Sequence, residues 1–266
     1  NKELVFYYTA NTDVSYTVKY LEKDTNKVLA EEETRTDKTF NETYKETAKD
    51  VTGYTVDAAE KDITLDAYNK ELVFYYTANT DVSYTVKYLE KDTDKVLAEE
   101  ETRTDKTFNE TYKETAKEVT GYTVDETEKS ITLDAYNKEL VFYYTANTDV
   151  SYKVKYLEKD TNKVLAAEET RKDKTFNETY KETAKEVTGY TVDVAEKDIT
   201  LDAYNKELVF YYTANKNVSY TVKYLEKDTD KVLAGKETRK GKTFNETYKE
   251  TAKEVTGYTV DETEKS

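Results

Sequence analysis

The chain has 266 residues and carries 41 Lys and Arg against 56 Asp and Glu, which gives a net charge of −15. It contains no His, Cys, Met, Trp or Pro, so a Ser–His–Asp triad, a Cys nucleophile, a disulfide and an ordinary zinc site are excluded. The acidic balance argues against nucleic-acid binding, and no apolar run approaches the length of a membrane span. We therefore expect no cofactor and no nucleic-acid or membrane partner.

One segment, Asn-Lys-Glu-Leu-Val-Phe-Tyr-Tyr, occurs four times along the chain and begins at Asn1, Asn69, Asn137 and Asn205. The four copies are evenly spaced, so the chain is a tandem repeat of one unit. This spacing is longer than the unit of a typical solenoid repeat and is long enough for a small domain with its own hydrophobic core. The repeat predicts a chain of tandem small domains.

The first predicted elements of the unit form a β-hairpin. Residues 14–20 alternate between apolar and polar side chains, which is typical of a half-buried strand. Residues 23–27, Lys-Asp-Thr-Asn-Lys, have the composition of a turn, and residues 28–34 can return as the second strand.

The next predicted element is a short helix. Phe40, Tyr44, Ala48 and Val51 are spaced so that they would share one helical face. Asn41 opens a formal glycosylation sequon, Asn-Glu-Thr, but we interpret it as the residue that caps this helix. Gly is common just after a helix, so Gly53 is expected to end it.

Three further strands complete the unit, at residues 54–56, 63–65 and 71–76. The last is apolar on both faces, which suits a strand in the centre of a sheet. The order ββαβββ predicts an α+β fold, a β-grasp-like mixed sheet with one short helix. In this arrangement the first and last strands lie side by side and parallel in the middle.

The repeat also predicts the domain boundaries. We expect a last strand of a preceding repeat plus linker, three complete repeats and one repeat without its last strands, at residues 1–13, 14–77, 82–145, 150–213 and 218–266. The linkers are short and the one at residues 78–81 contains no Gly, so we expect an extended rod. The two incomplete ends suggest a hypothesis of strand addition, in which residues 1–9 of one molecule complete the C-terminal repeat of another.

Three motifs of the unit resemble those of the MucBP (mucin-binding protein) repeat. Residues 16–24, Tyr-Thr-Val-Lys-Tyr-Leu-Glu-Lys-Asp, resemble its opening motif VxVxYxDxxG, although Thr25 or Asn26 stands where Gly is usual. Residues 51–56, Val-Thr-Gly-Tyr-Thr-Val, resemble its central xxGYxL motif, with Thr52 in place of the usual Pro. Residues 72–76, Leu-Val-Phe-Tyr-Tyr, resemble its closing VxYxY strand. The resemblance implies β-grasp-like repeats of a wall-anchored Gram-positive surface protein, often in the stalk of an adhesin.

Two functions agree with these features. The first is a stalk that projects a ligand-binding head from the cell wall, because near-identical copies add length without adding variety. The second is weak multivalent binding of host mucin or another host glycan by each repeat. Since mucin is itself acidic, such binding should strengthen with added salt or calcium. We expect an extracellular protein whose wall anchor lies outside this stretch, and no enzymatic activity.

Tyrosine is the residue type that serves either packing or sugar binding. Four tyrosines fall on predicted core-facing or sheet positions and are assigned to packing: Tyr16, Tyr20, Tyr54 and Tyr75. Other tyrosines are expected to be exposed near the domain junctions, where they would stiffen the joint or contact a ligand: Tyr68, Tyr76, Tyr136, Tyr144, Tyr204 and Tyr212.

Two further patterns have simpler explanations than a site. Asp24 and Asn26 have the spacing of a calcium loop, but Leu29 and Arg35 stand where an EF-hand needs Gly and Glu. We interpret this segment as a turn, with weak surface binding of calcium as the alternative. Lys19 could form an isopeptide cross-link only if it faced inward, whereas the alternation of the first strand places it on the polar face.

Overall fold

A computed structural model describes residues 2–266. The first repeat contains β1 (Val14–Glu22), β2 (Val28–Lys38), β3 (Thr43–Thr47), β4 (Tyr54–Val56), β5 (Glu60–Thr64) and β6 (Lys70–Ala78). The second contains β7 (Val82–Glu90), β8 (Val96–Lys106), β9 (Thr111–Thr115), β10 (Tyr122–Val124), β11 (Glu128–Thr132) and β12 (Lys138–Ala146). The third contains β13 (Val150–Glu158), β14 (Val164–Lys174), β15 (Thr179–Thr183), β16 (Tyr190–Val192), β17 (Glu196–Thr200) and β18 (Glu207–Ala214).

The fourth repeat contains β19 (Val218–Leu225), β20 (Val232–Lys242), β21 (Glu250–Thr251) and β22 (Glu264–Lys265). The contacts divide the chain into two compact units, one reaching to Thr145 and the other beginning at Ala146. The first and second repeats therefore share one unit, and the third and fourth share the other.

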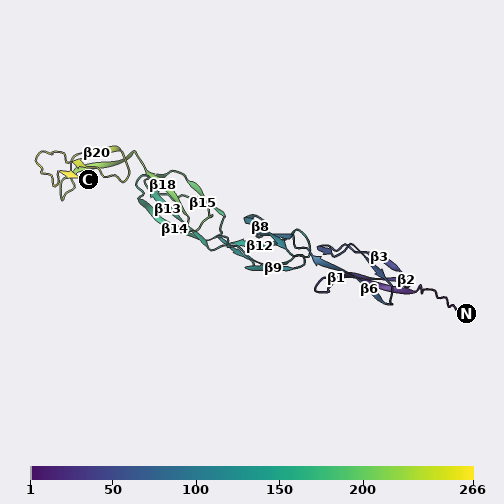
Figure 1. Ribbon diagram of the computed structural model, residues 1–266. Helices are drawn as coiled ribbons and strands as arrows, with labels where there is room; N and C mark the ends of the chain where they lie inside the picture. Colours follow the sequence, from purple (N-terminus) through teal and green to yellow (C-terminus); the bar gives the residue numbers. More distant parts are fainter. Residues whose placement is uncertain (1) are drawn as a thin grey trace. The chain divides into compact units, whose positions relative to one another are not determined.

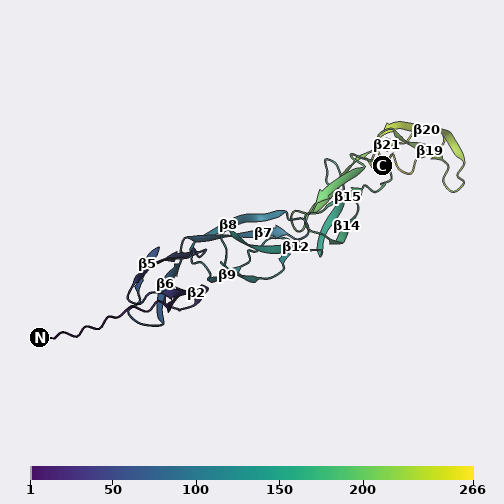
Figure 2. The same ribbon diagram turned by 90° about the vertical axis from the view of Figure 1, so that its right-hand side faces the viewer.

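Each complete repeat is built on a four-stranded sheet, which in the first repeat has the order β2-β1-β6-β4. Figure 1 labels β1, β2 and β6 of this sheet. The central strands β1 and β6 are parallel, with Tyr16 opposite Lys70 and Glu22 opposite Tyr76. The outer strands β2 and β4 pair antiparallel with them. The second and third repeats use the same order, and Figure 2 shows β7, β8 and β12 of the second side by side. The predicted parallel pairing of the first and last strands is confirmed.

The predicted helix is wrong, and with it the α+β, β-grasp-like fold class, because the described residues form strands and no helix. Residues 43–47 form β3, which pairs antiparallel with β5 and places Tyr44 opposite Ile63. Side chains from this two-stranded sheet and from the four-stranded sheet meet in one hydrophobic cluster. Each complete repeat is therefore an all-β, sandwich-like domain.

The spacing that suggested a helix fits a strand equally well. Tyr44 and Ala48 are four residues apart, and four is a multiple of the two-residue period of a strand as well as about one helical turn. The inward position between them is Glu46, which is only 9% exposed, so a charged residue concealed the alternation. Asn41 and Gly53 flank no helix, and they occupy turns with φ angles of +63° and +82°.

The core of the repeat is aromatic. Strand β1 alternates as predicted, with Tyr16 and Tyr20 at most 2% exposed, and β6 contributes Phe74 and Tyr76 from the neighbouring position. The rings of Tyr20 and Phe74 stack with their centroids 6.0 Å apart. Burying such large side chains supplies most of the apolar area that a domain of this size can remove from water.

A partly buried ion pair joins the two sheets. Arg35 on β2 donates from Nε to Oε1 of Glu46 at 2.9 Å and from Nη2 to Oε2 at 3.0 Å. The hydroxyl of Tyr16 on β1 donates to the same carboxylate at 2.6 Å. Burial raises the pKa of Glu46, but the hydrogen bonds from Arg35 and Tyr16 lower it by more, so the pKa lies below its ordinary value. Three strands are therefore tied to one ionised side chain.

The substitution Glu46→Gln should lower the free energy of unfolding of the first repeat by about 1–3 kcal/mol at pH 7, because Arg35 and Tyr16 both lose a charged acceptor and Arg35 keeps only its ion pair with Glu33. A carboxyl group with a lowered pKa stabilises the fold above its unfolded pKa of about 4.3, and this stabilisation is lost as the pH falls. The variant should therefore lose less stability than the wild type between about pH 5 and pH 3. Urea unfolding across this range measures both effects.

The matched control is Glu60→Gln. Glu60 forms an ion pair with Lys45 at 3.0 Å, but both side chains are more than half exposed. Such surface pairs contribute little, so the change should stay within about 0.5 kcal/mol. Equal losses at Glu46 and Glu60 would contradict the role assigned to the partly buried pair.

Candidate functional site

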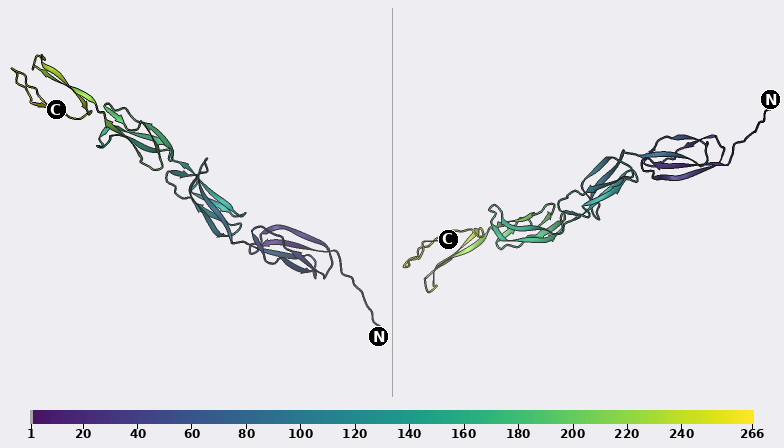
Figure 3. Two further views of the ribbon diagram at one scale, coloured as in Figure 1. Left: turned by 90° about the horizontal axis from the view of Figure 1, so that it is seen from above. Right: turned by 60° about the horizontal axis from the view of Figure 1, so that its bottom comes forward.

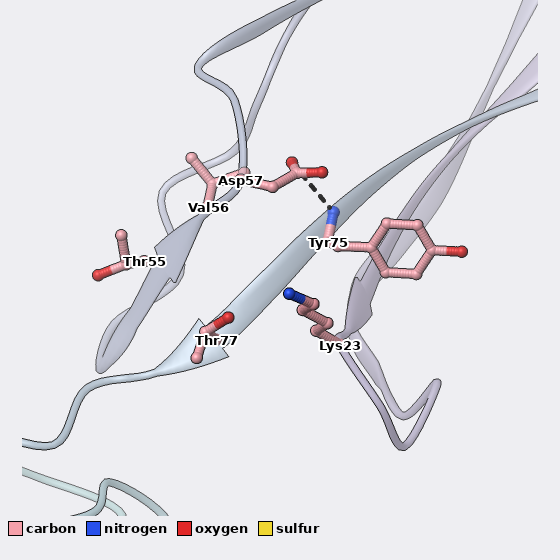
Figure 4. Close-up of a pocket in the computed structure, with 6 residues that line it drawn as sticks. All are labelled: Lys23, Thr55, Val56, Asp57, Tyr75 and Thr77. Carbon is pink, nitrogen blue, oxygen red and sulfur yellow. Dashed lines mark hydrogen bonds between the residues drawn. The ribbon is translucent and has the colours of Figure 1, made fainter.

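A shallow depression of about 460 Å³ lies on the outer face of the four-stranded sheet in the first repeat. We call it the outer groove, and it is lined by Lys23, Thr55, Val56, Asp57, Tyr75 and Thr77 (Figure 4). Phe74 and Tyr76 point into the core, so the intervening Tyr75 faces outward. The groove thus brings an aromatic ring together with hydroxyl, carboxylate and ammonium groups.

Apolar side chains continue the groove across the sheet. Tyr75 pairs with Leu21 of β1, and Leu21 pairs with Val28 of β2, so the three side chains form one row on the outer face. Val28 is 66% exposed. An outward row of this kind adds nothing to the core of the repeat, which makes it a candidate contact surface.

The charged groups of the outer groove are held in fixed positions. The backbone N–H of Tyr75 donates to Oδ1 of Asp57 at 3.4 Å, as Figure 4 shows, and Lys61 forms an ion pair with Oδ2 at 2.6 Å. Burial raises the pKa of Asp57, but the hydrogen bond from Lys61 and its charge outweigh this, so the pKa lies below its ordinary value. The groove therefore presents a carboxylate at neutral pH, and the ammonium of Lys61 lies 5.7 Å from the centre of the Tyr75 ring.

The same residue types recur at the equivalent positions of the next two repeats. They are Lys91, Thr123, Val124, Asp125, Tyr143 and Thr145 in the second, and Lys159, Thr191, Val192, Asp193, Tyr211 and Thr213 in the third. The residue after the aspartate differs, being Ala58, Glu126 and Val194 in turn. The residue types that line the groove are thus repeated in the sequence, while the residue that follows the aspartate varies.

The expectation of exposure is wrong for Tyr76, Tyr144 and Tyr212, which are each 1% exposed. The hydroxyl of Tyr76 donates to the backbone carbonyl of Lys49 at 2.7 Å, so the side chain is fully used within the repeat. Tyr75, which the sequence pattern assigns to packing, is the outward residue instead. Residues 72–76 are all apolar or aromatic, so the sequence does not show which of them face the core and which face outward.

The other three predicted site residues lie where the linker enters their own repeat. Tyr68, Tyr136 and Tyr204 are 53%, 45% and 45% exposed. In each case the ring packs beside a phenylalanine at 5.5 Å, as in the pair Phe108 and Tyr136. The side-chain amide of Asn79 donates to the hydroxyl of Tyr136 at 2.9 Å. Tyr136 is therefore part of the connection between the first and second repeats.

Two more residues join that connection and are missed by the sequence pattern. The ring of Phe108 packs edge-on against Tyr54 of the first repeat, with centroids 5.8 Å apart and planes at 72°. It also lies directly over Gly53, the one glycine of the first repeat. The sequence does give one hint, because Gly53 is the only glycine of the first repeat. Its position after the predicted helix, however, suggests a helix end and not a contact with an aromatic ring.

Asn79 binds both repeats through four hydrogen bonds. Toward the first repeat, its N–H donates to the carbonyl of Gly53 at 2.9 Å and its Oδ1 accepts from Thr55 at 2.7 Å. Toward the second, its carbonyl accepts from the N–H of Phe108 at 2.8 Å, and its amide contacts Tyr136 as described. The linker is therefore held on both sides and is not a free tether.

The remaining predicted features lie on the surface. Asp24 and Asn26 are in the turn after β1, with φ angles of +72° and +57°. Lys19 faces outward, as expected, and pairs with Glu71 at 2.5 Å. Residues 2–266 contain no group of three or more acidic side chains arranged to hold a metal ion. No helix in this part of the chain has the length and apolar character to cross a membrane.

Two curated relatives are Internalin J proteins of Listeria monocytogenes. The protein from serotype 4b (strain F2365) is 28% identical over 275 residues, which cover 98% of this chain and 29% of the relative. The protein from serovar 1/2a (strain ATCC BAA-679 / EGD-e) is 27% identical over 257 residues, which cover 92% of this chain and 29% of the relative. The chain thus spans less than a third of the length of these relatives.

Solved structures give weaker similarities. The Bacillus anthracis TIE protein is 9% identical with a TM-score of 0.32, over 77% of this chain and 51% of that one. The type 2 repeat of the mucus binding protein MUB from Lactobacillus reuteri is 16% identical with a TM-score of 0.19, over 50% of this chain and 100% of that one. The family model of the MucBP domain matches residues 16–77, 84–145, 153–213 and 220–266. The chain is a tandem array of MucBP domains and belongs to that family.

Proposed function

We propose that this chain is the repeat stalk of a Gram-positive cell-surface adhesin and projects a ligand-binding head from the cell wall. The observation that carries the proposal is the parallel pairing of β1 and β6, because the chain enters a repeat at one end and leaves it at the other. The linker at Asn79 is then hydrogen-bonded to both neighbours. Each added repeat therefore adds length. The similarity to Internalin J agrees with a surface location.

Small-angle X-ray scattering of the full chain tests this proposal. A strand of nine residues is about 30 Å long, so four repeats placed end to end would exceed about 100 Å and give a radius of gyration of about 30–40 Å. A compact protein of this length would have about 18 Å. A value near the lower figure, or a broad distribution of dimensions, would count against a stiff stalk.

A second function, weak binding of mucin or another host glycan by each repeat, is supported by the outer groove. Its tyrosine offers an aromatic face for a sugar ring, and Lys23, Thr55 and Thr77 offer hydrogen-bonding groups beside it. The groove residues recur at the same position of each complete repeat, so weak single sites would combine through avidity. The name of the MUB repeat, a mucus binding protein, agrees with this class of ligand.

Replacing Tyr75, Tyr143 and Tyr211 together by Ala should weaken retention on a mucin-coated surface by at least about tenfold, because each groove loses its stacking face. The same three changes to Phe keep the ring and should leave binding within about twofold. Measurements with increasing salt show whether charge repulsion opposes binding. Unchanged binding of the Ala variant would remove the groove from consideration, while binding by neither protein would leave the stalk as the only proposed function.

We also propose that residues 2–9 of one molecule can add to β19 of another. Residues 2–10 form no strand and extend from the first repeat (Figure 3), with Leu4 81% and Phe6 70% exposed. In the fourth repeat β19 has only β20 as a neighbour among the described strands. The added strand would occupy the place that β6 takes beside β1. Residue 1, which the hypothesis included, lies outside the described residues.

Sedimentation velocity over a range of concentrations should show end-to-end oligomers of the full chain. The substitution Phe6→Asp should abolish them, because Phe6 corresponds to Phe74, which is completely buried in its own repeat. Tyr7→Asp is the matched control, since Tyr7 corresponds to the outward Tyr75 and should leave association intact. A monomer at every concentration would refute strand addition.

A further inference from the structure

The hydrophobic core of the second repeat extends into the first. The cluster built around Tyr84, Phe108 and Phe142 also contacts Tyr54 and Ala78, which belong to the preceding repeat. Phe108 is 6% exposed as a result. The two neighbouring repeats therefore share apolar contacts as well as a linker. A stalk of independently folded domains would need only the linker.

The shared contact is tightly shaped around a glycine. A Cβ atom on Gly53 would lie 2.2 Å from Cδ1 of Phe108, so any side chain at this position would clash with the ring. Gly53 also has a φ angle of +82°, which a residue with a side chain adopts only with strain. Between the third and fourth repeats, Gly189 and Phe244 meet in the same way, with 2.3 Å from the Cβ position to the ring. The arrangement is thus a recurring one.

The first repeat shows the same residues with no repeat packed against them among residues 2–13. Phe40 corresponds to Phe108 and packs against its own Tyr68 at the same 5.5 Å, but it remains half-buried rather than buried. At the other end, Gly257 has a φ angle of +85° and no atom within 4 Å of its Cβ position. The extra burial of Phe108 therefore comes from the neighbouring repeat, and Gly257 adopts the same φ region without a ring against it among the described residues.

We propose that the surface around Gly53 and Tyr54 is a docking site for the Phe108 face of the following repeat, and that this docking supplies part of the folding stability of the first repeat. Neighbouring repeats are then energetically coupled, as in a one-dimensional array with interface terms. The partner that the surface fits is another repeat that carries Phe at this position. The proposal concerns stability and holds whether the array serves as a stalk or binds glycans.

Hydrogen exchange of the full chain, followed by mass spectrometry, tests the coupling. The peptide at residues 51–60 reports on the docking site, and Ala58 and Ala59 distinguish it from the other repeats. The substitution Phe108→Ala lies in the second repeat but should accelerate exchange at residues 54–56 of the first by at least about fivefold. The control Tyr144→Ala removes another buried ring from the core of the second repeat, but Tyr144 pairs with Glu90 at the exit end of that repeat, so this peptide should be unchanged.

A second pair of variants avoids the core altogether. Asn79→Ala removes the side chain that bridges Thr55 and Tyr136, and should accelerate exchange at residues 54–56 by about threefold or more. Asn11→Ala removes the equivalent side chain at the entry of the first repeat, which donates to Tyr68 at 2.5 Å, and should leave that peptide unchanged. If Phe108→Ala and Asn79→Ala both leave residues 54–56 unchanged, the repeats fold independently and the proposal is wrong. It is also wrong if Tyr144→Ala has as large an effect as Phe108→Ala.

Discussion

The parallel pairing of β1 with β6 is the constraint on which the rest of each repeat depends. Two parallel strands cannot be joined by a tight turn, so the four intervening strands serve as the connection between them. Two of these strands, β3 and β5, form the second sheet and close the core, while β2 and β4 join the first sheet. The pairing also sends the chain out of the repeat at the end opposite to its entry, so the exit of one repeat meets the entry of the next. Both the buried core and the joint between repeats follow from it.

The strands with clear alternation could be predicted from the sequence, and the connection between them could not. In β1, every second residue is apolar or aromatic, and the burial of Tyr16 and Tyr20 follows directly. In β3, the inward position is Glu46, and its burial is tolerated only because Arg35 and Tyr16 satisfy the carboxylate. These partners are distant in sequence, so no local pattern could show that a charged residue faces the core.

The residues of the candidate surfaces could not be predicted from the sequence of a single strand, because they depend on neighbouring strands and on the following repeat. Whether Tyr75 or Tyr76 faces outward is set by the partners of β6 on both sides, since a shift of one residue exchanges the two faces. The function of Gly53 depends on the ring of Phe108, which belongs to the following repeat. The family, by contrast, could be recognised from the order of three short motifs along the chain. The match to the MucBP domain confirms this resemblance.

The hydrogen-bonded linker at Asn79 has a consequence for how such a chain can change in evolution. Each repeat carries its own entry face and its own exit face, and the segment between them is almost the same in every copy. Recombination between copies can therefore insert or delete whole repeats and recreate an existing joint each time. A change in the length of the linker alone would separate an aromatic ring from its glycine. We therefore expect the number of repeats to vary more readily than the length of the linker.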